Sequence, residues 1–284
     1  MEVSFIAEVS SNHHQSIDRC YEFIDKAAEI GCKSVKFQLF RINQLFSKEI
    51  LNKDKEIRDR VNWELPLEFI PLISERCKSR KIAFGCTPFD LEAVKILEPY
   101  VDFYKIASYE LLWHKLIKEC CSTGKPLILS TGMANIAEIN AALEVVKNYS
   151  SINFSLLHCI SGYPTPPEEC NLSAIKTLKN LDKNIKVGWS DHSVNENVIF
   201  RAVYHWGASI VEFHLDLDGK GGEFKTGHCW LPEKISRVIN SINESELVDG
   251  NSEKIASEIE LKEREWRADP EDGLRPLRHI RSKY

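Results

Sequence analysis

Two histidines stand where neighbouring β-rich segments of the sequence end, the place at which parallel strands present groups for chemistry. His192 follows one such segment and His214 closes the next. Their imidazoles could approach a single divalent ion, and two nitrogen ligands with open positions suit a Lewis acid such as manganese or zinc. Asp191 and Glu212 are candidates for orienting the two rings. The alternative is that each histidine is an ordinary hydrogen-bonded loop residue.

Two lysines lie inside apolar, β-rich segments, where a charged side chain needs a reason. Lys36 stands in Ser-Val-Lys-Phe-Gln and Lys105 in Phe-Tyr-Lys-Ile-Ala. Burying an unpaired ammonium group is costly. Each lysine could point outward or pair with a carboxylate such as Glu8 as interior filling. We favour the other interpretation, in which both converge with hydroxyl groups on a phosphate or carboxylate ligand.

Further polar residues sit at the same segment ends and complete the candidate site. They offer carboxylate, amide and hydroxyl groups, at Glu8, Gln38, Thr87, Ser108, Glu110, Ser130, Ser161, Tyr163, Ser190 and Glu212. His228 and Cys229, in Gly-His-Cys-Trp, lack partners at a recognisable metal-ligand spacing, and we place no zinc there.

The elements that would position these residues alternate between short β-rich runs and longer segments of helical period. Candidate strands lie at 3–9, 34–38, 82–86, 103–107, 127–130, 154–159, 186–190 and 209–214. Amphipathic helices follow them at 17–30, 67–80, 91–98, 112–122, 136–147, 172–180, 195–206 and 233–242. Eight such pairs predict a (β/α)8 barrel, the TIM-barrel class of α/β fold, with the site at the carboxyl ends of its strands. An open doubly wound sheet is the alternative, but residues 8–13 lack its glycine-rich phosphate turn.

Composition narrows the class of protein further. The chain has 284 residues and a formal net charge of −5, too mild and mixed to indicate a nucleic-acid or anionic-membrane partner. No apolar run approaches a membrane span and residues 1–10 do not resemble a signal peptide, so we expect a cytoplasmic protein. The nine cysteines show no Cys-x-x-Cys pair and read mostly as buried thiols. We expect the barrel domain over 1–243 and a charged, arginine-rich extension over 244–284, with a helix at 253–267.

The strand-end strings together resemble the N-acetylneuraminate (sialic acid) synthases and their relatives that make other nonulosonic acids. The matching strings are Ile6-Ala7-Glu8 with Asn12-His13, Val35-Lys36-Phe37-Gln38, Cys86-Thr87-Pro88-Phe89-Asp90, Tyr104-Lys105-Ile106-Ala107-Ser108, Leu129-Ser130-Thr131-Gly132-Met133, Leu157-His158-Cys159, Tyr163-Pro164-Thr165-Pro166 and Ser190-Asp191-His192. They occur in family order from residue 3 to about residue 214.

The resemblance implies an enzyme that condenses phosphoenolpyruvate with an open-chain amino sugar aldehyde on a (β/α)8 barrel and releases phosphate. It implies a divalent ion, manganese(II) first, with magnesium, cobalt or zinc as alternatives, held by His192 and His214. The positions of Lys36, Thr87, Lys105, Ser130 and Ser190 match those that hold phosphoenolpyruvate. Glu8 and Glu110 match acidic residues that face the sugar and the reacting carbons. Family likeness also suggests a homodimer.

The sequence departs from the family pattern on the sugar side. Relatives usually carry a C-terminal antifreeze-like domain that contributes an arginine to the sugar's acyl-amino group, whereas this sequence ends at Tyr284. The usual Gly-Pro-Asp string after the eighth strand is replaced by residues 221–228, and Ser161-Gly162 and Tyr109 also differ. We therefore expect a different acceptor, or a replacement arginine from the extension, at Arg267, Arg275, Arg278 or Arg281, or from a separate protein.

Two other functions fit the residues. A desolvated Lys105 or Lys36 could act as the nucleophile of a Schiff-base aldolase or lyase of 2-keto-3-deoxy sugar acids. A catalytically silent barrel that binds a sugar or a partner is the second alternative. Retention of the whole charged set at the strand ends argues against silence.

Overall fold

The strands form a closed parallel barrel, which confirms the predicted fold class. The computed structural model describes residues 2–149 and 152–284. Strands pair in sequence order and β1 also pairs with β8, which closes the cylinder. Every strand end lies within two residues of its predicted position. The strands are β1 (Ser4–Glu8), β2 (Ser34–Leu39), β3 (Ala83–Pro88), β4 (Phe103–Ile106), β5 (Leu127–Ser130), β6 (Phe154–Cys159), β7 (Lys186–Asp191) and β8 (Ile210–Leu215).

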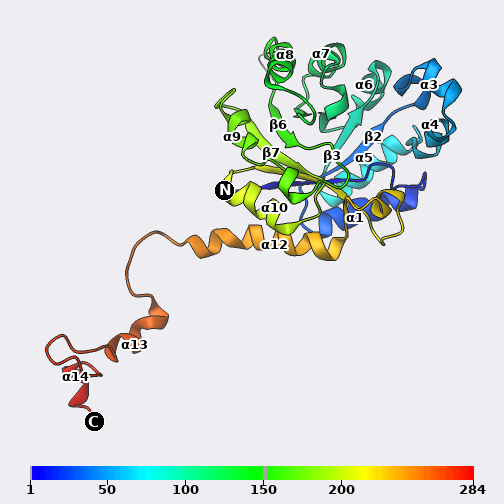
Figure 1. The fold of residues 1–284 in the computed structure, drawn as a ribbon. Helices are drawn as coiled ribbons and strands as arrows, with labels where there is room; N and C mark the ends of the chain where they lie inside the picture. The colour runs from blue at the N-terminus through cyan, green and yellow to red at the C-terminus, as the bar shows by residue number, and fades with distance from the viewer. Residues whose placement is uncertain (1, 150–151) are drawn as a thin grey trace. The chain divides into compact units, whose positions relative to one another are not determined.

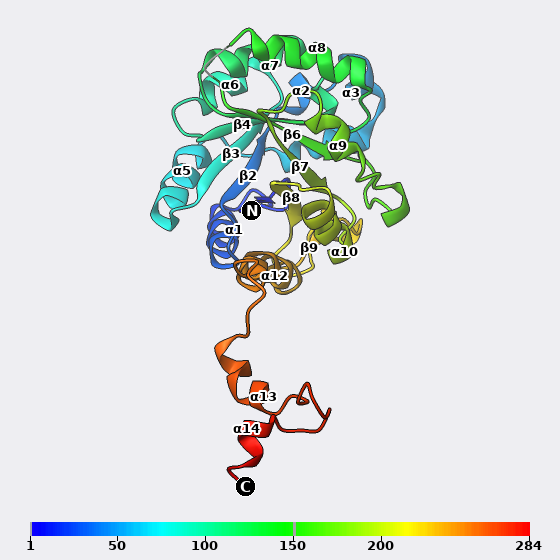
Figure 2. The ribbon, with the colours of Figure 1, turned by 90° about the vertical axis from the view of Figure 1, so that its left-hand side faces the viewer.

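Helices surround the strands (Figures 1 and 2). They are α1 (Ile17–Glu29), α5 (Phe69–Arg80), α6 (Leu91–Leu97), α7 (His114–Ser122), α8 (Ile136–Lys147), α9 (Ala174–Lys179), α10 (Glu196–Phe200) and α12 (Pro232–Asp249). Local sequence fixes several starts. Ser16 accepts from the amide of Arg19 at the start of α1, and Asn135 and Glu138 form a capping box at α8.

The structure adds elements that the sequence pattern did not predict. Between β2 and α5 the chain forms three short helices, α2 (Ile42–Leu45), α3 (Lys48–Lys53) and α4 (Lys55–Asp59), and a 3-10 turn at Arg60–Trp63. After β8 come a one-turn helix, α11 (Gly222–Lys225), and a two-residue strand, β9 (Cys229–Trp230), paired with β8. The predicted helix at 195–206 is present, but its second half, Arg201–His205, is a π-helix.

An apolar layer fills the barrel interior before the strands reach their carboxyl ends. It consists of Ile6, Phe103, Ile128, Leu157 and Ile210, one from each of five strands. Two of the three remaining strands, β3 and β7, make room for it with glycines. A Cβ at Gly85 would lie 2.1 Å from the Phe103 ring, and one at Gly188 would lie 2.2 Å from the Ile210 carbonyl oxygen. The interior is therefore a packed core up to the level at which polar residues begin.

A second, larger core lies between the strands and the helices, where Trp189, Tyr104, Phe5 and Phe84 are all less than 2% exposed. All nine cysteines are free and buried, as predicted. None of the described helices is both long enough and apolar enough to cross a bilayer.

The chain divides into two compact units, Met1–Asn243 and Glu244–Tyr284. In the second unit the helix predicted at 253–267 is shorter, because a 3-10 turn at Glu258–Glu260 leads into α13 (Leu261–Glu265), and a further helix, α14 (Arg278–Arg281), follows. Arg281 forms an ion pair with Asp272, and Arg278 with Asp269, Glu271 and Asp272. Two of the arginines proposed to reach a substrate therefore already face carboxylates of their own unit.

Candidate active site

Along the strands, the next inward-facing residue after the apolar layer is polar. Because side chains alternate along a strand, a residue two positions after an inward residue also faces inward. Ile6 is followed in this way by Glu8, Phe103 by Lys105, Ile128 by Ser130 and Ile210 by Glu212. All four polar residues are less than 5% exposed. The alternation along the strands thus places these four predicted site residues in one polar layer at the carboxyl ends of the strands.

Lys36 from β2 lies against Glu8 from β1, which its strand register places directly opposite. The two side chains form a buried ion pair, and the Lys36 Nζ also lies 3.1 Å from Thr87 Oγ1. Gln38 Nε2 donates to Glu8 Oε1 at 2.7 Å. Burial alone would lower the pKa of Lys36, but the carboxylates of Glu212 and Glu8 outweigh it and raise that pKa. Lys36 is therefore a protonated donor within the barrel.

Lys105 from β4 meets Glu212 from β8 across the barrel. Its Nζ lies 2.6 Å from Glu212 Oε1, and Ser190 Oγ donates to the same oxygen at 3.1 Å. Burial lowers the pKa of Lys105 in spite of Glu212. Burial would raise the pKa of Glu212, but Lys105 and Lys36 together lower it to about 2. Both lysines thus point inward, and each is paired with a carboxylate. This pairing was the alternative to the ligand-binding interpretation that we favoured from the sequence.

Several predicted site residues keep buried polar atoms without a hydrogen-bond partner among the described residues. These atoms are Oε2 of Glu110, Oγ of Ser130, Oγ of Ser161 and Oε2 of Glu212. Buried polar groups are normally paired, so such a group of orphans indicates where a polar ligand would bind.

Gly132 marks one wall of this space. Its amide donates to Ser108 Oγ at 3.0 Å, and a Cβ on it would lie 2.4 Å from Ser161 Oγ and 2.8 Å from Ser108 Oγ. The loops after β4, β5 and β6 therefore meet at two hydroxyl groups, Ser108 Oγ and Ser161 Oγ, which can donate to an anion.

Glu110 differs from Glu8 and Glu212 because it forms no ion pair with a cation among the described residues. Burial raises its pKa from 4.5 to about 7. A carboxyl group of this kind can hold or release a proton near neutral pH.

The structure brings His192 and His214 together, with ring centroids 5.3 Å apart. His192 Nδ1 lies 2.8 Å from the Ile160 carbonyl oxygen, which leaves Nε2 of that ring to face a ligand. Tyr163 packs on His192 with centroids 4.2 Å apart. Burial lowers the pKa of His192, so its imidazole is neutral, the form that binds metals.

Asp191 does not orient His192 as we had expected. Its carboxylate accepts instead from the indole NH groups of Trp189 and Trp230, at 2.9 and 2.8 Å, and from Ser193. The side chain that orients a histidine here is Glu223, whose Oε2 lies 2.9 Å from His214 Nδ1. Glu212 is likewise occupied by Lys105 rather than by a histidine.

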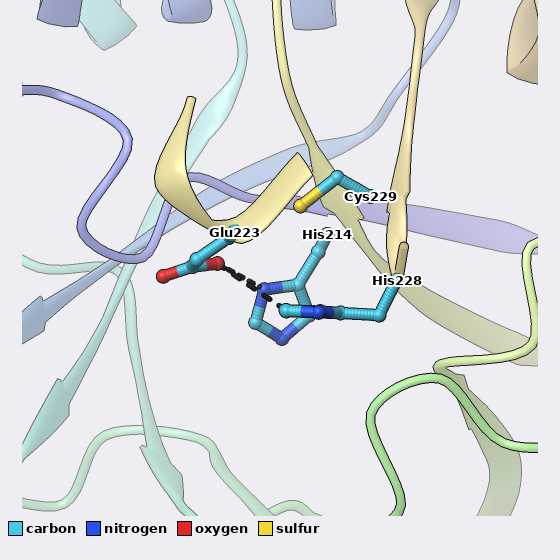
Figure 3. Close-up of side chains that lie close together, drawn as sticks. All are labelled: His214, Glu223, His228 and Cys229. Atoms are coloured by element: carbon cyan, nitrogen blue, oxygen red, sulfur yellow. Dashed lines mark hydrogen bonds and ion pairs between the residues drawn. The ribbon is translucent and has the colours of Figure 1, made fainter. Parts of the chain in front are cut away.

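His228 and Cys229, for which the sequence spacing showed no metal-ligand partners, have such partners nearby in the structure. One ligand atom from each of His214, Glu223, His228 and Cys229 lies within 4.8 Å of all the others (Figure 3). Pairing of β9 with β8 sets Cys229 opposite His214, and α11 brings Glu223 to the same place. The only sequence signal was a glutamate and a His-Cys pair in the segment after the eighth strand.

The donor set around His214 fits a divalent metal ion, since it offers imidazole, carboxylate and thiol groups at one place in the strand-end layer. The same end of the barrel holds most of the predicted ligand-binding residues, which are Glu8, Lys36, Gln38, Thr87, Lys105, Ser130 and Ser190. The site therefore combines two candidate halves, one with donors for an anion and one with ligands for a metal ion. We call them the anion-binding half and the metal-binding half.

Comparisons with known proteins agree with this arrangement. Residues 23–254 match the NeuB family. An uncharacterized protein of Methanocaldococcus jannaschii is 37% identical over 257 residues, which cover 88% of this chain and 73% of the relative. The N,N'-diacetyllegionaminic acid synthase of Campylobacter jejuni is 34% identical over 272 residues, covering 90% and 80%.

Among solved structures, an N-acetylneuraminic acid synthetase from Leptospira borgpetersenii superposes with a TM-score of 0.80 and 30% identity, covering 93% of this chain and 90% of that chain. The matched relatives thus include sugar acid synthases, and the family match covers strands β2 to β8 and the loop after β8. The chain belongs to the NeuB family.

Proposed function

We propose that the protein is a synthase that joins phosphoenolpyruvate to an amino sugar aldehyde, giving a nonulosonic 2-keto-3-deoxy sugar acid and inorganic phosphate. One observation carries the proposal most directly. Two buried lysines, unpaired buried hydroxyls and a histidine cluster share the carboxyl-end layer of one barrel. The names of the relatives, which include N,N'-diacetyllegionaminic acid synthase, support the same reaction class.

The anion-binding half suits phosphoenolpyruvate. Ser130 and Ser161 have hydroxyl groups without a hydrogen-bond partner among the described residues, and the hydroxyls of Ser108 and Ser161 both lie next to Gly132. Lys36 and Lys105 add positive charge from two further strands. Donors that converge from several directions can hold a phosphate and offset its charge as it departs.

The metal-binding half suits the aldehyde. A divalent ion held by the histidines, with His192 and His214 as the predicted ligands and manganese(II) as the predicted ion, would act there as a Lewis acid on the aldehyde oxygen. The enol carbon of phosphoenolpyruvate then forms a bond to the aldehyde carbon. Water adds at the phosphate-bearing carbon, and the carbon–oxygen bond to phosphate breaks to leave the keto group.

Two glutamates have environments that suit proton transfer in these steps. Glu8 is held next to Lys36 and can take a proton from the attacking water. Glu110, whose burial raises its pKa to about 7, can supply the proton that the new hydroxyl group requires. Different surroundings thus give the two carboxyl groups opposite roles.

A Schiff-base aldolase is the second candidate, because burial lowers the pKa of Lys105 and a neutral amine is the nucleophile that this chemistry uses. Against it, the Glu212 carboxylate lies 2.6 Å from Lys105 Nζ and opposes the effect of burial by favouring the protonated form of that nitrogen. We therefore rank condensation first.

The experiment is a product analysis. The purified protein is incubated with phosphoenolpyruvate, a panel of N-acylated amino sugars and one divalent ion at a time, and products are identified by mass spectrometry. We expect a keto acid whose mass is that of one sugar plus pyruvate, and we expect Ser130→Ala to reduce its rate of formation. Absence of any such product across the panel would reject the synthase.

The acceptor-side contribution of the C-terminal unit stays a prediction, as does the homodimer. Since Arg278 and Arg281 are paired within their own unit, Arg267 and Arg275 are the better candidates for contacting a substrate.

A further inference from the structure

The four residues around His214 form a cluster that the anion-binding half does not use. His214, Glu223 and His228 have side chains 12%, 18% and 7% exposed, and Cys229 is 3% exposed. They come from β8, α11 and the start of β9, and Figure 3 shows their side chains turned toward one another. Three chain segments therefore deliver nitrogen, oxygen and sulfur donors to one largely buried place.

The hydrogen bonds of Thr226 determine which nitrogen of His228 is free. Thr226 Oγ1 donates its single proton to the Glu223 carbonyl oxygen at 2.7 Å. The same Oγ1 lies 2.7 Å from His228 Nδ1, so it accepts there and Nδ1 carries the proton. His228 Nε2 then presents a lone pair, and the nearest acid oxygen, Glu223 Oε2, lies 3.5 Å from it. Two lone pairs face each other, an arrangement that a cation between them would stabilise.

Glu223 is held in position for this role. Its other oxygen, Oε1, accepts from the amide and hydroxyl of Ser11 at 3.2 and 2.8 Å. Oε2 is thereby turned to His214 Nδ1, 2.9 Å away, and to His228 Nε2. Ligand atoms about 2.1 Å from one ion lie roughly 3.0–3.4 Å apart at ordinary coordination angles. The distances from Glu223 Oε2, which are 2.9 Å to His214 Nδ1 and 3.5 Å to His228 Nε2, lie close to the two ends of that range.

Cys229 decides the class of ion. Its sulfur lies within 4.8 Å of the other three ligand atoms and 3.7 Å from Asn12 Nδ2, a donor that would stabilise a thiolate. A thiolate and imidazoles favour zinc, cobalt or iron, whereas magnesium and manganese prefer oxygen ligands.

We propose that His214, Glu223, His228 and Cys229 hold one divalent ion of the zinc class, with the loop after β8 supplying ligands that the pair His192 and His214 lacks. When the ion binds, the His214 proton moves from Nδ1 to Nε2, and the Cys229 thiol releases its proton to solvent. The ion's use as the Lewis acid rests on the proposed function, but its binding does not. The binding is therefore measured on the full chain without phosphoenolpyruvate or sugar, so that it can fail or succeed independently of the synthase assay.

The test titrates metal-free protein with cobalt(II) and follows absorbance. We expect one equivalent to bind, with a thiolate-to-cobalt charge-transfer band in the near ultraviolet. Cys229→Ser should lose that band, and Glu223→Gln and His228→Asn should each weaken cobalt and zinc binding at least about 10-fold. Matched controls are the buried Cys121→Ser and the exposed Glu233→Gln and His205→Asn, which should bind like the parent chain.

The parent spectrum alone can overturn the proposal, whatever the variants do to folding. A stoichiometry below one or the absence of a charge-transfer band rejects the four-residue site. So does a band that survives Cys229→Ser, or parent-like affinity in both Glu223→Gln and His228→Asn. Circular dichroism of each metal-free variant establishes that a loss of binding is not a loss of fold.

Discussion

Lys105 and Glu212 are 107 positions apart in the sequence, and their side chains meet inside the barrel with Nζ 2.6 Å from Oε1. The pair joins β4 to β8, and Ser190 of β7 donates to the same carboxylate oxygen. Closure of the barrel is what makes this contact, because no helix or hairpin brings these strands together. Under the proposed function, the same buried charges serve both stability and ligand binding.

Removing one member of this pair should cost more than removing both. Lys105→Met leaves the Glu212 carboxylate buried beside fewer cations, and we expect a loss of about 3–5 kcal/mol in the free energy of unfolding. The double variant Lys105→Met, Glu212→Leu should regain a substantial part. Urea unfolding of the three chains measures this, and a double variant as unstable as the single one would show that the pair is not coupled.

Gly85 should not tolerate a side chain, because its Cβ would lie 2.1 Å from the Phe103 ring. We expect Gly85→Ala to lower the free energy of unfolding by about 1–3 kcal/mol, the usual cost of overpacking. Phe103→Leu in the same chain should offset part of the loss. Gly222→Ala, where a Cβ meets nothing within 4 Å, is the control. Equal stability of Gly85→Ala and the control would refute this packing.

Glu110 should make stability fall as pH rises. Its pKa is raised by burial from 4.5 to about 7 in the folded chain. Between these two values the unfolded chain loses the proton while the folded chain keeps it, so the unfolded state binds fewer protons and the free energy of unfolding decreases with pH. Glu110→Gln removes this loss.

The variant should therefore gain stability relative to the parent from pH 4.5 to 7, by about 3 kcal/mol at most. Denaturant unfolding at a series of pH values measures the difference, with the exposed Glu75→Gln as the control. A pH-independent difference between Glu110→Gln and the parent would contradict the assignment.

Borohydride trapping separates the two candidate chemistries. We expect pyruvate and sodium borohydride to leave the mass of the protein unchanged, because the Glu212 carboxylate occupies Lys105 Nζ and favours its protonated form. Peptide mapping by mass spectrometry would detect the opposite result, a reduced pyruvate adduct on Lys105 or Lys36, which would favour the aldolase.

The inward-facing layer was predictable because it depends on a local pattern. Lys36 and Lys105 interrupt apolar strands. The two-residue alternation along a strand then places Lys105 on the same face as Phe103. The partners of the two lysines were harder to predict. Glu8 was a stated possibility for Lys36, but the pairing of Lys105 with Glu212 depends on the curvature and closure of the whole barrel.

The loop after β8 was not predictable from spacing. Glu223, His228 and Cys229 acquire a common neighbour, His214, only because the two-residue strand β9 pairs with β8. So short a strand leaves no alternating pattern in the sequence. Asp191 shows the converse error, since a carboxylate next to a candidate metal ligand is committed to two tryptophan indoles in the surrounding core.

Phosphate release is the measurement that tests the central claim most directly. Phosphoenolpyruvate and a divalent ion are supplied with and without each amino sugar, and phosphate and keto acid are quantified in the same reaction. We predict that phosphate appears only when an accepted sugar is present, in a one-to-one ratio with the new keto acid, and that a chelator stops both. Phosphate release that does not depend on any sugar, or keto acid formed without phosphate, would contradict the account.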